Sequence, residues 1–264
     1  MTRVTVKSIR EKKGREKIAV LTAYDFPFAR LLDEAGIDII LVGDSLGMVL
    51  LGYDSTLPVT MRDMIHHTKP VARAVKQALV VSDMPFGSYA TPEQALRNAR
   101  RLIQDGGAEA VKLEGGEAVA KTVKTLVKAG IPVMGHLGMT PQTATLLGGY
   151  KVQGRAPKQA QKILEDAGRL EEAGVFSLVL ECVPAALAGK ITKKISVPTI
   201  GIGAGPKTDG QVLVLHDLLG FEGGVKPRFT RRYAEFEKEA KRAFSRYLAD
   251  VRSGSFPNGK ESFE

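Results

Sequence analysis

The feature that most constrains the fold is a regular alternation of short apolar runs with longer amphipathic stretches along the 264 residues. Short apolar runs between helical segments are typical of strands that are buried on both faces of a parallel sheet. The predicted strands are 18–25, 37–42, 79–82, 109–113, 131–136, 175–181, 197–203 and 211–215. Eight strands that alternate with helices predict an α/β protein, a (β/α)8 TIM barrel, with an open doubly wound sheet as the alternative.

Helix start and stop signals lie between these runs. Thr60 with Asp63 forms a capping-box pattern, and Thr91-Pro92 with Gln94 combines an N-cap, a proline in the first turn and a polar N3 residue. The predicted helices are 28–35, one from Thr60 that Pro70 should interrupt, one from Thr91 to Gly106, one ending at Ala129, then 157–173 and 231–251. No change of composition suggests a linker, so we expect one barrel domain over 1–264, with a short N-terminal segment and a polar C-terminal tail.

Two loops interrupt the alternation. The segment 46–58 contains Gly47, Gly52 and Pro58 and is long for a connection in a compact domain. Loops of this length often close over binding sites, so we expect 46–58 to be a lid. A second, glycine-rich loop surrounds Gly148, Gly149 and Gly154.

Composition excludes several classes of protein. No apolar run is long enough for a membrane span, and the N-terminal segment lacks the apolar core of a signal peptide. Cys182 is the single cysteine, which excludes a disulfide framework and a cysteine-rich zinc site. A cytoplasmic protein is expected. The net charge of +9 could indicate a nucleic-acid binder, but the basic residues are interleaved with acidic ones, which favours solvated helix faces and anionic small substrates instead.

Polar residues gather where the predicted strands end. In a (β/α)8 barrel the C-terminal strand ends meet at one mouth, where catalytic residues lie. Those residues are Asp44 and Ser45 on the second strand, Asp83 on the third, Lys112 and Glu114 on the fourth, His136 on the fifth and Glu181 on the sixth. Lys112 and Glu114 are two residues apart, so they should point to the same face.

Three carboxylates at one mouth predict a metal site. Asp44, Asp83 and Glu114 offer only oxygen ligands, which favours Mg²⁺ over zinc. Each acid alone could instead be a helix N-cap or a rim salt bridge.

Glu181 follows the apolar segment 178–180, and a partly buried carboxylate is an effective proton acceptor near neutral pH. A salt bridge to a nearby lysine is the alternative for Glu181.

The remaining candidates are less determined. Lys112 could neutralise a substrate carboxylate or pair with Glu114, and a Schiff base is disfavoured because a metal would duplicate its role as electron sink. His136 could bond a substrate oxygen or be a structural rim residue. Cys182 is not favoured as a nucleophile, since alternation from Glu181 should point it toward the surrounding helices. The helical His66 and His67 are expected to be packing or surface residues.

With these residues in place, the chain resembles the ketopantoate hydroxymethyltransferase (3-methyl-2-oxobutanoate hydroxymethyltransferase) family from the first strand almost to the C-terminus. The matching strings are LTAYD at 21–25, LVGDSLGM at 41–48, DSTLPVT at 54–60, YATPEQA at 89–95, VKLEGG at 111–116, GHLGMTPQ at 135–142, GGYKVQGR at 148–155, LECVP at 180–184 and GIGAG at 201–205. No single string would be specific, but the set is.

The resemblance implies functions for individual residues. It implies that Mg²⁺ binds through Asp44 and Asp83, with Glu114 completing the acidic site, and that Glu181 is the proton acceptor. It implies that Ser45, Asp83 and Lys112 contact the keto acid. A contact of His136 with the keto or product oxygen is our own hypothesis.

The resemblance also implies an activity and an assembly. The expected reaction transfers a hydroxymethyl group from 5,10-methylenetetrahydrofolate to 3-methyl-2-oxobutanoate and gives 2-dehydropantoate, in pantothenate and coenzyme A biosynthesis. The expected fold is a barrel of the phosphoenolpyruvate/pyruvate type, and the expected assembly is a homo-oligomer, commonly a decamer. The alternatives are a phosphoenolpyruvate-mutase-like or isocitrate-lyase-like enzyme of the same fold, and a basic nucleic-acid-binding barrel.

Overall fold

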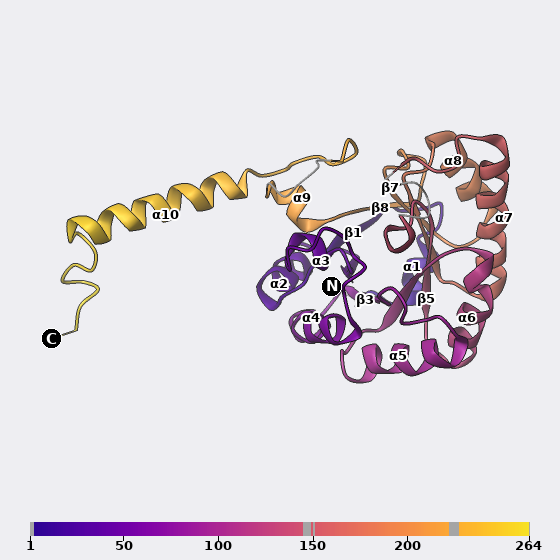
Figure 1. Ribbon diagram of the computed structural model, residues 1–264, viewed down its shortest axis with the longest axis horizontal. Helices are drawn as coiled ribbons and strands as arrows, with labels where there is room; N and C mark the ends of the chain where they lie inside the picture. Colours follow the sequence, from indigo (N-terminus) through magenta and orange to yellow (C-terminus); the bar gives the residue numbers. More distant parts are fainter. Residues whose placement is uncertain (1–2, 145–148, 150, 222–226, 264) are drawn as a thin grey trace. The chain divides into compact units, whose positions relative to one another are not determined.

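Eight parallel strands close into a barrel in the computed structural model, which describes residues 3–144, 149, 151–221 and 227–263 (Figure 1). Each strand pairs with the next along the chain, and the first also pairs with the last, with Ile18 opposite Gly210. The strands are β1 (Ile18–Thr22), β2 (Ile39–Val42), β3 (Leu79–Asp83), β4 (Ala110–Glu114), β5 (Val133–Gly138), β6 (Ser177–Glu181), β7 (Thr199–Ile202) and β8 (Gly210–Leu213). The predicted (β/α)8 barrel is confirmed, and the β1–β8 pairing excludes the open sheet.

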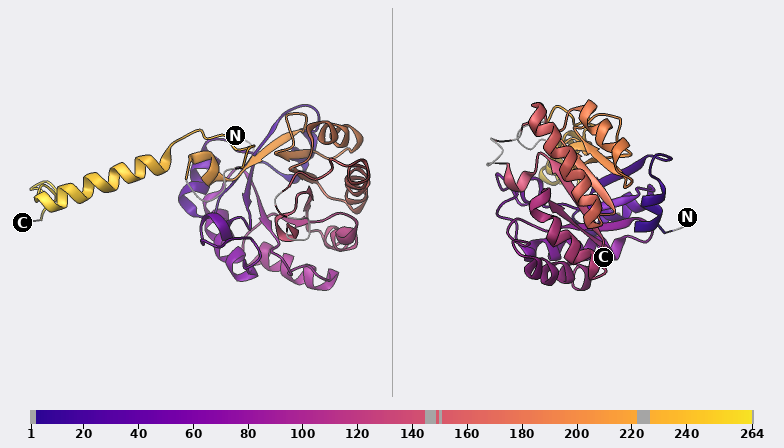
Figure 2. Two further views of the ribbon diagram at one scale, coloured as in Figure 1. Left: turned by 45° about the horizontal axis from the view of Figure 1, so that its top comes forward. Right: turned by 90° about the vertical axis from the view of Figure 1, so that its right-hand side faces the viewer.

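Helices cover the outside of the barrel, and α4 to α8 follow one another around it in Figures 1 and 2. The helices of this part of the chain are α1 (Val6–Glu11), α2 (Phe26–Glu34), α3 (Leu46–Val49), α4 (Met61–Ala74), α5 (Pro92–Gln104), α6 (Glu117–Lys128), α7 (Pro157–Ala173) and α8 (Ala185–Lys194), with a short 3-10 helix at Pro141–Thr143. The predicted start signals are confirmed: Thr91 caps α5, Thr60 caps α4 in a capping box with Asp63, and α7 has the predicted bounds.

Three local predictions need correction. The first strand ends at Thr22 rather than residue 25, because the Asp25 carboxylate accepts a hydrogen bond from the Phe28 N–H and caps α2. Pro70 lies inside α4 without ending it, and His66, whose carbonyl loses its helical partner there, is an exposed residue. The loop 46–58 begins with the single turn of α3. Gly148, in the predicted glycine-rich loop, lies outside the described residues.

The interior of the barrel is apolar at the N-terminal end of the strands, and α1 closes that end. Ile9 of α1 is fully buried in a cluster with inward residues of the strands. Those strand residues are Ile18, Val20, Ile39, Leu41, Leu79, Val81, Ala110, Met134, Val179, Ile200 and Val212. Burial of this cluster excludes water from the N-terminal end of the barrel, so the polar residues are confined to the opposite end.

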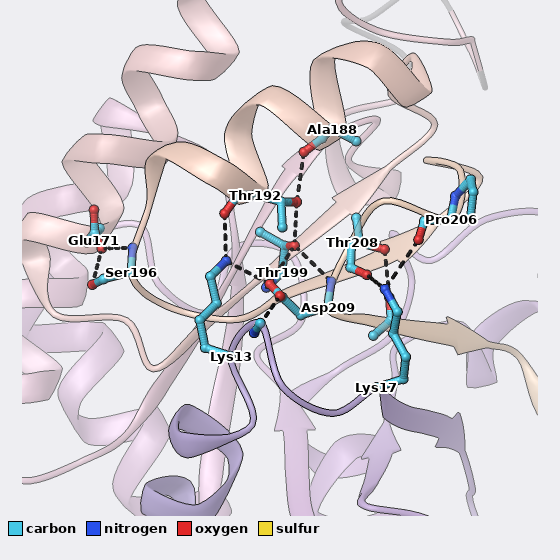
Figure 3. A network of polar contacts seen from close by, with 12 residues as sticks. Lys13, Lys17, Glu171, Ala188, Thr192, Ser196, Thr199, Pro206, Thr208 and Asp209 are labelled. Carbon is cyan, nitrogen blue, oxygen red and sulfur yellow. Dashed lines mark hydrogen bonds and ion pairs between the residues drawn. The ribbon is translucent and has the colours of Figure 1, made fainter.

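A buried ion pair fastens the seam where β7 and β8 meet the start of β1 (Figure 3). The Asp209 carboxylate, which is 6% exposed, accepts hydrogen bonds from Lys13 Nζ at 2.7 Å and the Thr199 N–H at 2.8 Å. It also accepts one from the Gly14 N–H at 3.1 Å. Asp209 thus joins the segment before β1 to the first residue of β7.

The chain forms two compact units, Met1–Val214 and Leu215–Glu264. The second unit holds α9 (Leu215–Leu219) and α10 (Phe236–Ser253), so Leu215, the last residue of the predicted eighth strand, begins a helix instead. The predicted helix 231–251 corresponds to α10, which begins five residues later because 231–235 are irregular. No helix in the described ranges is long and apolar enough to cross a membrane.

Candidate active site

The inward-facing side chains of the strands are apolar along most of the barrel and become polar at its C-terminal end. Val81 is followed two residues later by Asp83, Ala110 by Lys112, and Met134 by His136. Because side chains two residues apart in a strand share a face, these polar groups also point into the barrel. Asp83, Lys112, Glu114, His136 and Glu181 are all buried there.

The end of β2 places Asp44 and Ser45 beside Asp83. The Asp44 N–H donates to Asp83 Oδ2 at 3.1 Å, and a Cβ on Gly43 would lie 2.9 Å from Ser45 Oγ, so a side chain at position 43 would displace the Ser45 hydroxyl. Ser45 Oγ does not cap α3 but lies 2.9 Å from the hydroxyl of the buried Tyr24. The strand end therefore presents one carboxylate and one hydroxyl in fixed positions.

Lys112 lies among the three carboxylates. Its Nζ is 3.1 Å from Asp83 Oδ1 and 3.7 Å from Glu114 Oε1, and it is also 3.1 Å from His136 Nδ1. The predicted common face of Lys112 and Glu114 is confirmed. Burial opposes the charge on Lys112, but the carboxylates of Asp83, Glu114 and Asp44 outweigh it and raise the pKa, so Lys112 remains an ammonium ion.

His136 connects the acidic group to Glu181. Its Nδ1 lies 3.5 Å from Glu114 Oε1, and its Nε2 lies 3.2 Å from Glu181 Oε2. Burial and Lys112 both disfavour the charged imidazole, yet hydrogen bonds with Glu114 and Glu181 raise the pKa of His136 to about 9. His136 therefore contacts Glu114, a predicted metal ligand, and Glu181, the predicted proton acceptor. The sequence alone did not predict these contacts.

The three acids differ in how their charge is stabilised. Burial, followed by repulsion from Asp83 and Glu114, raises the pKa of Asp44 well above its ordinary value. Burial also raises the pKa of Asp83, although Lys112 opposes this effect. For Glu114, burial is outweighed by His136, Lys112 and the Gln142 N–H, so its pKa is lowered. Burial and mutual repulsion thus oppose ionisation of Asp44 in particular, whereas Glu114 is held in its charged form.

The donor set fits a hard divalent cation. Asp83 Oδ1 and Glu114 Oε1 are buried oxygens without a hydrogen bond of good geometry. The three acids of the site offer carboxylate oxygens, which are the ligands that hard divalent cations prefer. However, within the described ranges no three His, Cys, Asp or Glu side chains stand at the spacing of a formed metal site. Lys112 Nζ instead lies between Asp83 and Glu114, so a bound cation would have to displace it.

Several residues near the site were not predicted from the sequence. Gln142 contacts Asp44 and Glu114, Tyr24 contacts Ser45, and His67 Nδ1 lies 2.8 Å from the Tyr24 carbonyl oxygen. Tyr24 and Gln142 fall inside the matching strings at 21–25 and 135–142, which was the available signal.

Cys182 also differs from expectation. It leaves β6 with a left-handed backbone (φ 48°), so strand alternation does not apply to it. Burial and the neighbouring Glu181 raise the pKa of its thiol to about 11, which disfavours the thiolate that nucleophilic attack would need.

Comparison with known proteins decides the family. The family model described as ketopantoate hydroxymethyltransferase matches residues 3–259. The chain belongs to the ketopantoate hydroxymethyltransferase family. A 3-methyl-2-oxobutanoate hydroxymethyltransferase of Thermoanaerobacter sp. (strain X514) is 60% identical over 254 residues, which cover 96% of this chain and 92% of the relative. A protein of that name from Thermus thermophilus is 56% identical over 99% of this chain and 100% of its own length.

Solved structures place this family member in a wider fold group. A phosphonopyruvate hydrolase complex with oxalate and Mg²⁺ matches with a TM-score of 0.62 at 14% identity, covering 99% of this chain and 93% of the other. A 2,3-dimethylmalate lyase, described as a member of the phosphoenolpyruvate mutase/isocitrate lyase superfamily, matches at 0.61 and 14% identity, covering 98% and 91%. These structures share the barrel fold with this chain, and the predicted transferase family is confirmed.

Proposed function

We propose that the chain transfers a hydroxymethyl group from 5,10-methylenetetrahydrofolate to 3-methyl-2-oxobutanoate, giving 2-dehydropantoate and tetrahydrofolate in pantothenate and coenzyme A biosynthesis. The observation that carries the proposal is the convergence of Asp44, Asp83, Glu114, Lys112 and Glu181 at one barrel mouth, in a chain of this family. A keto acid needs an anion-binding group, a base for C3 and stabilisation of the developing oxyanion. This mouth offers residues for all three.

Asp44, Asp83 and Glu114 would hold Mg²⁺. When bound, the ion would supply Lewis-acid stabilisation of the charge that develops on the keto oxygen. Asp83 Oδ1 and Glu114 Oε1 accept no hydrogen bond of good geometry, and a bound cation would relieve the repulsion among the three acids; both observations support this assignment.

Glu181 is proposed to accept the C3 proton. It lies at the end of β6, 9% exposed, with His136 Nε2 3.2 Å from its carboxylate. This ion-pair contact with His136 keeps the Glu181 carboxylate beside the other polar groups of the mouth. The His136 contact with the keto or product oxygen stays part of this proposal.

Lys112 and Ser45 are proposed to bind the keto acid, with Asp83. The ammonium ion of Lys112 neutralises the substrate carboxylate, and the hydroxyl and backbone of Ser45 contact the substrate. The raised pKa of Lys112 argues against a Schiff base, which requires a neutral amine. After the C3 proton leaves, C3 forms a bond to the one-carbon unit, water supplies the hydroxyl oxygen, and both bonds from that carbon to the folate nitrogens break. The C3 proton and one proton of the water balance the two N–H groups of tetrahydrofolate.

We also propose a cytoplasmic homo-oligomer, a decamer, built from a single barrel domain per chain. An apolar stripe on α10, Phe244, Tyr247, Leu248 and Val251, has the spacing of one helix face and is exposed, which supports burial against another copy. The lid assigned to 46–58 is supported by its exposed Leu50, Leu51, Tyr53 and Leu57, which closure over a ligand would cover.

Turnover tests the proposed activity directly. Purified enzyme with Mg²⁺, 5,10-methylenetetrahydrofolate and 3-methyl-2-oxobutanoate should form 2-dehydropantoate, detected by mass spectrometry. Phosphonopyruvate and isocitrate, offered in parallel, should not be consumed. Turnover of either of these with none of the keto acid would overturn the proposal in favour of a mutase-like or lyase-like enzyme.

A further inference from the structure

Gln142 occupies the centre of the acidic site without being one of its acids. It lies in the 3-10 helix that follows β5 and is 3% exposed. Its side-chain Nε2 donates to Asp44 Oδ2 at 2.8 Å, and its backbone N–H donates to Glu114 Oε2 at 3.0 Å. One residue therefore holds two carboxylates that come from different strands, β2 and β4.

The orientation of the Gln142 amide is fixed by its other contacts. Nε2 also donates to the Met84 carbonyl oxygen at 2.9 Å, so both of its N–H groups have acceptors. Oε1 accepts a hydrogen bond from the Tyr89 hydroxyl. A flipped amide would place Oε1 against the Asp44 carboxylate and the Met84 carbonyl, and both contacts would be repulsive. The buried network therefore has one satisfied arrangement.

The side chains of Lys112 and Gln142 contact different acids of the site. Lys112 lies within ion-pair distance of Asp83 and Glu114, whereas the Asp44 side chain accepts its hydrogen bond from the neutral amide. An ammonium ion beside Asp44 would cancel its charge, but an amide orients the carboxylate and leaves the charge in place. A cation that enters the site then meets a carboxylate group whose orientation is already set.

We propose that Gln142 is a positioning residue for a divalent cation: it holds Asp44 through its side chain and Glu114 through its backbone, and adds no charge of its own. This inference rests on the proposed Mg²⁺ site. Partners that orient metal ligands in this way typically contribute roughly 10–100-fold to metal affinity.

The test is Mg²⁺ affinity of the substrate-free enzyme, measured by isothermal titration calorimetry. Gln142→Leu should weaken binding roughly 10-fold or more, because Asp44 loses its donor while the backbone N–H to Glu114 remains. Gln142→Lys should weaken it further, because the new ammonium ion neutralises Asp44. Gln104→Glu, on the exposed end of α5, is the matched control and should bind Mg²⁺ like the wild type.

Tyr89→Phe supplies a second, milder variant. It removes the hydroxyl that fixes Oε1 and leaves every carboxylate contact in place, so Mg²⁺ affinity should fall several-fold with little change in thermal unfolding. If Gln142→Leu fails to fold, this variant decides the matter.

The outcomes separate the two proposals. Wild-type enzyme that binds Mg²⁺, with Gln142→Leu or Tyr89→Phe binding equally well, would overturn the role of Gln142 and leave the proposed function intact. Wild-type enzyme that binds no divalent cation and turns over without one would overturn the proposed metal site itself.

Discussion

At the scale of single residues, the site depends on buried polar groups that are not themselves acids. Tyr24 lies 2% exposed beneath Ser45, and its hydroxyl is 2.9 Å from Ser45 Oγ. Burial, partly offset by the Ser45 contact, raises the pKa of Tyr24, so the phenol stays protonated and can donate. The Ser45 hydroxyl can then direct its own proton toward a ligand.

Tyr24→Phe should raise the KM for 3-methyl-2-oxobutanoate several-fold, since Ser45 loses the group that orients its hydroxyl. Loss of one such hydrogen bond should lower the free energy of unfolding by about 1 kcal/mol. Steady-state kinetics of Tyr24→Phe, Ser45→Ala and the double variant form a cycle. If Tyr24 acts through Ser45, the double variant resembles Ser45→Ala; simple addition of the two effects would show that Tyr24 acts elsewhere.

Residues of this kind mark the limit of what the sequence could predict. Asp44, Asp83, Lys112, Glu114, His136 and Glu181 were predictable because barrel geometry places strand ends at one mouth. Gln142 was not, because it follows β5 on a short 3-10 helix and strand periodicity stops at Gly138. Its role depends on a turn that brings it back over the strand ends, which no local pattern encodes.

At the scale of elements, barrel closure depends on the contact between the N-terminal segment and the β7–β8 seam. Burial disfavours the charge on Asp209, but Lys13 and the N–H groups of Thr199 and Gly14 outweigh burial and hold the pKa of Asp209 below its ordinary value. A carboxylate with a lowered folded-state pKa stabilises the fold above its unfolded-state pKa. That contribution is lost as the pH falls through the folded-state pKa.

Asp209→Asn should lower the free energy of unfolding near neutral pH by about 2 kcal/mol, because it leaves the half-buried ammonium ion of Lys13 without its counter-ion. The difference from wild type should shrink as the pH falls below about 4, where the wild-type carboxylate also becomes protonated. Urea unfolding at constant protein concentration measures both. Glu34→Gln, which breaks an exposed pair with Arg30, is the control and should change the free energy by less than about 1 kcal/mol. A difference for Asp209→Asn that is independent of pH would contradict the ion-pair explanation.

The presence of most helices and strands was more predictable from the sequence than the residues at which they begin and end. The eight strands, and helices such as Pro157–Ala173, followed from apolar runs and capping residues. Helices α1 and α8 were not predicted, and α4 passes through Pro70 because packing of Met64, Thr68 and Val71 outweighs one lost hydrogen bond. In these cases burial against the rest of the barrel, rather than a local sequence signal, determined where a helix forms.

At the scale of the whole molecule, the apolar stripe of α10 bears on the proposed assembly. Light scattering coupled to gel filtration should give the mass of a decamer for the wild type. Phe244→Glu with Leu248→Glu should reduce the mass, because charges on the stripe would be buried against another copy. Lys238→Glu, another exposed residue of α10 outside the stripe, is the control and should keep the wild-type mass. A monomeric wild type would contradict the proposed oligomer.

The central claim is that this barrel mouth removes the C3 proton of 3-methyl-2-oxobutanoate with Glu181 and a divalent cation held by the acids. A tertiary C–H is a weak acid, so both should be required. The most direct measurement is exchange of the C3 proton with solvent deuterium, followed by NMR without folate. We predict exchange in the wild type with Mg²⁺. Exchange in Glu181→Gln should be slower by roughly 100-fold or more, a loss consistent with removal of a general base. Chelation of the metal should also make exchange slow. Exchange that is unaffected by both Glu181→Gln and chelation would contradict the account.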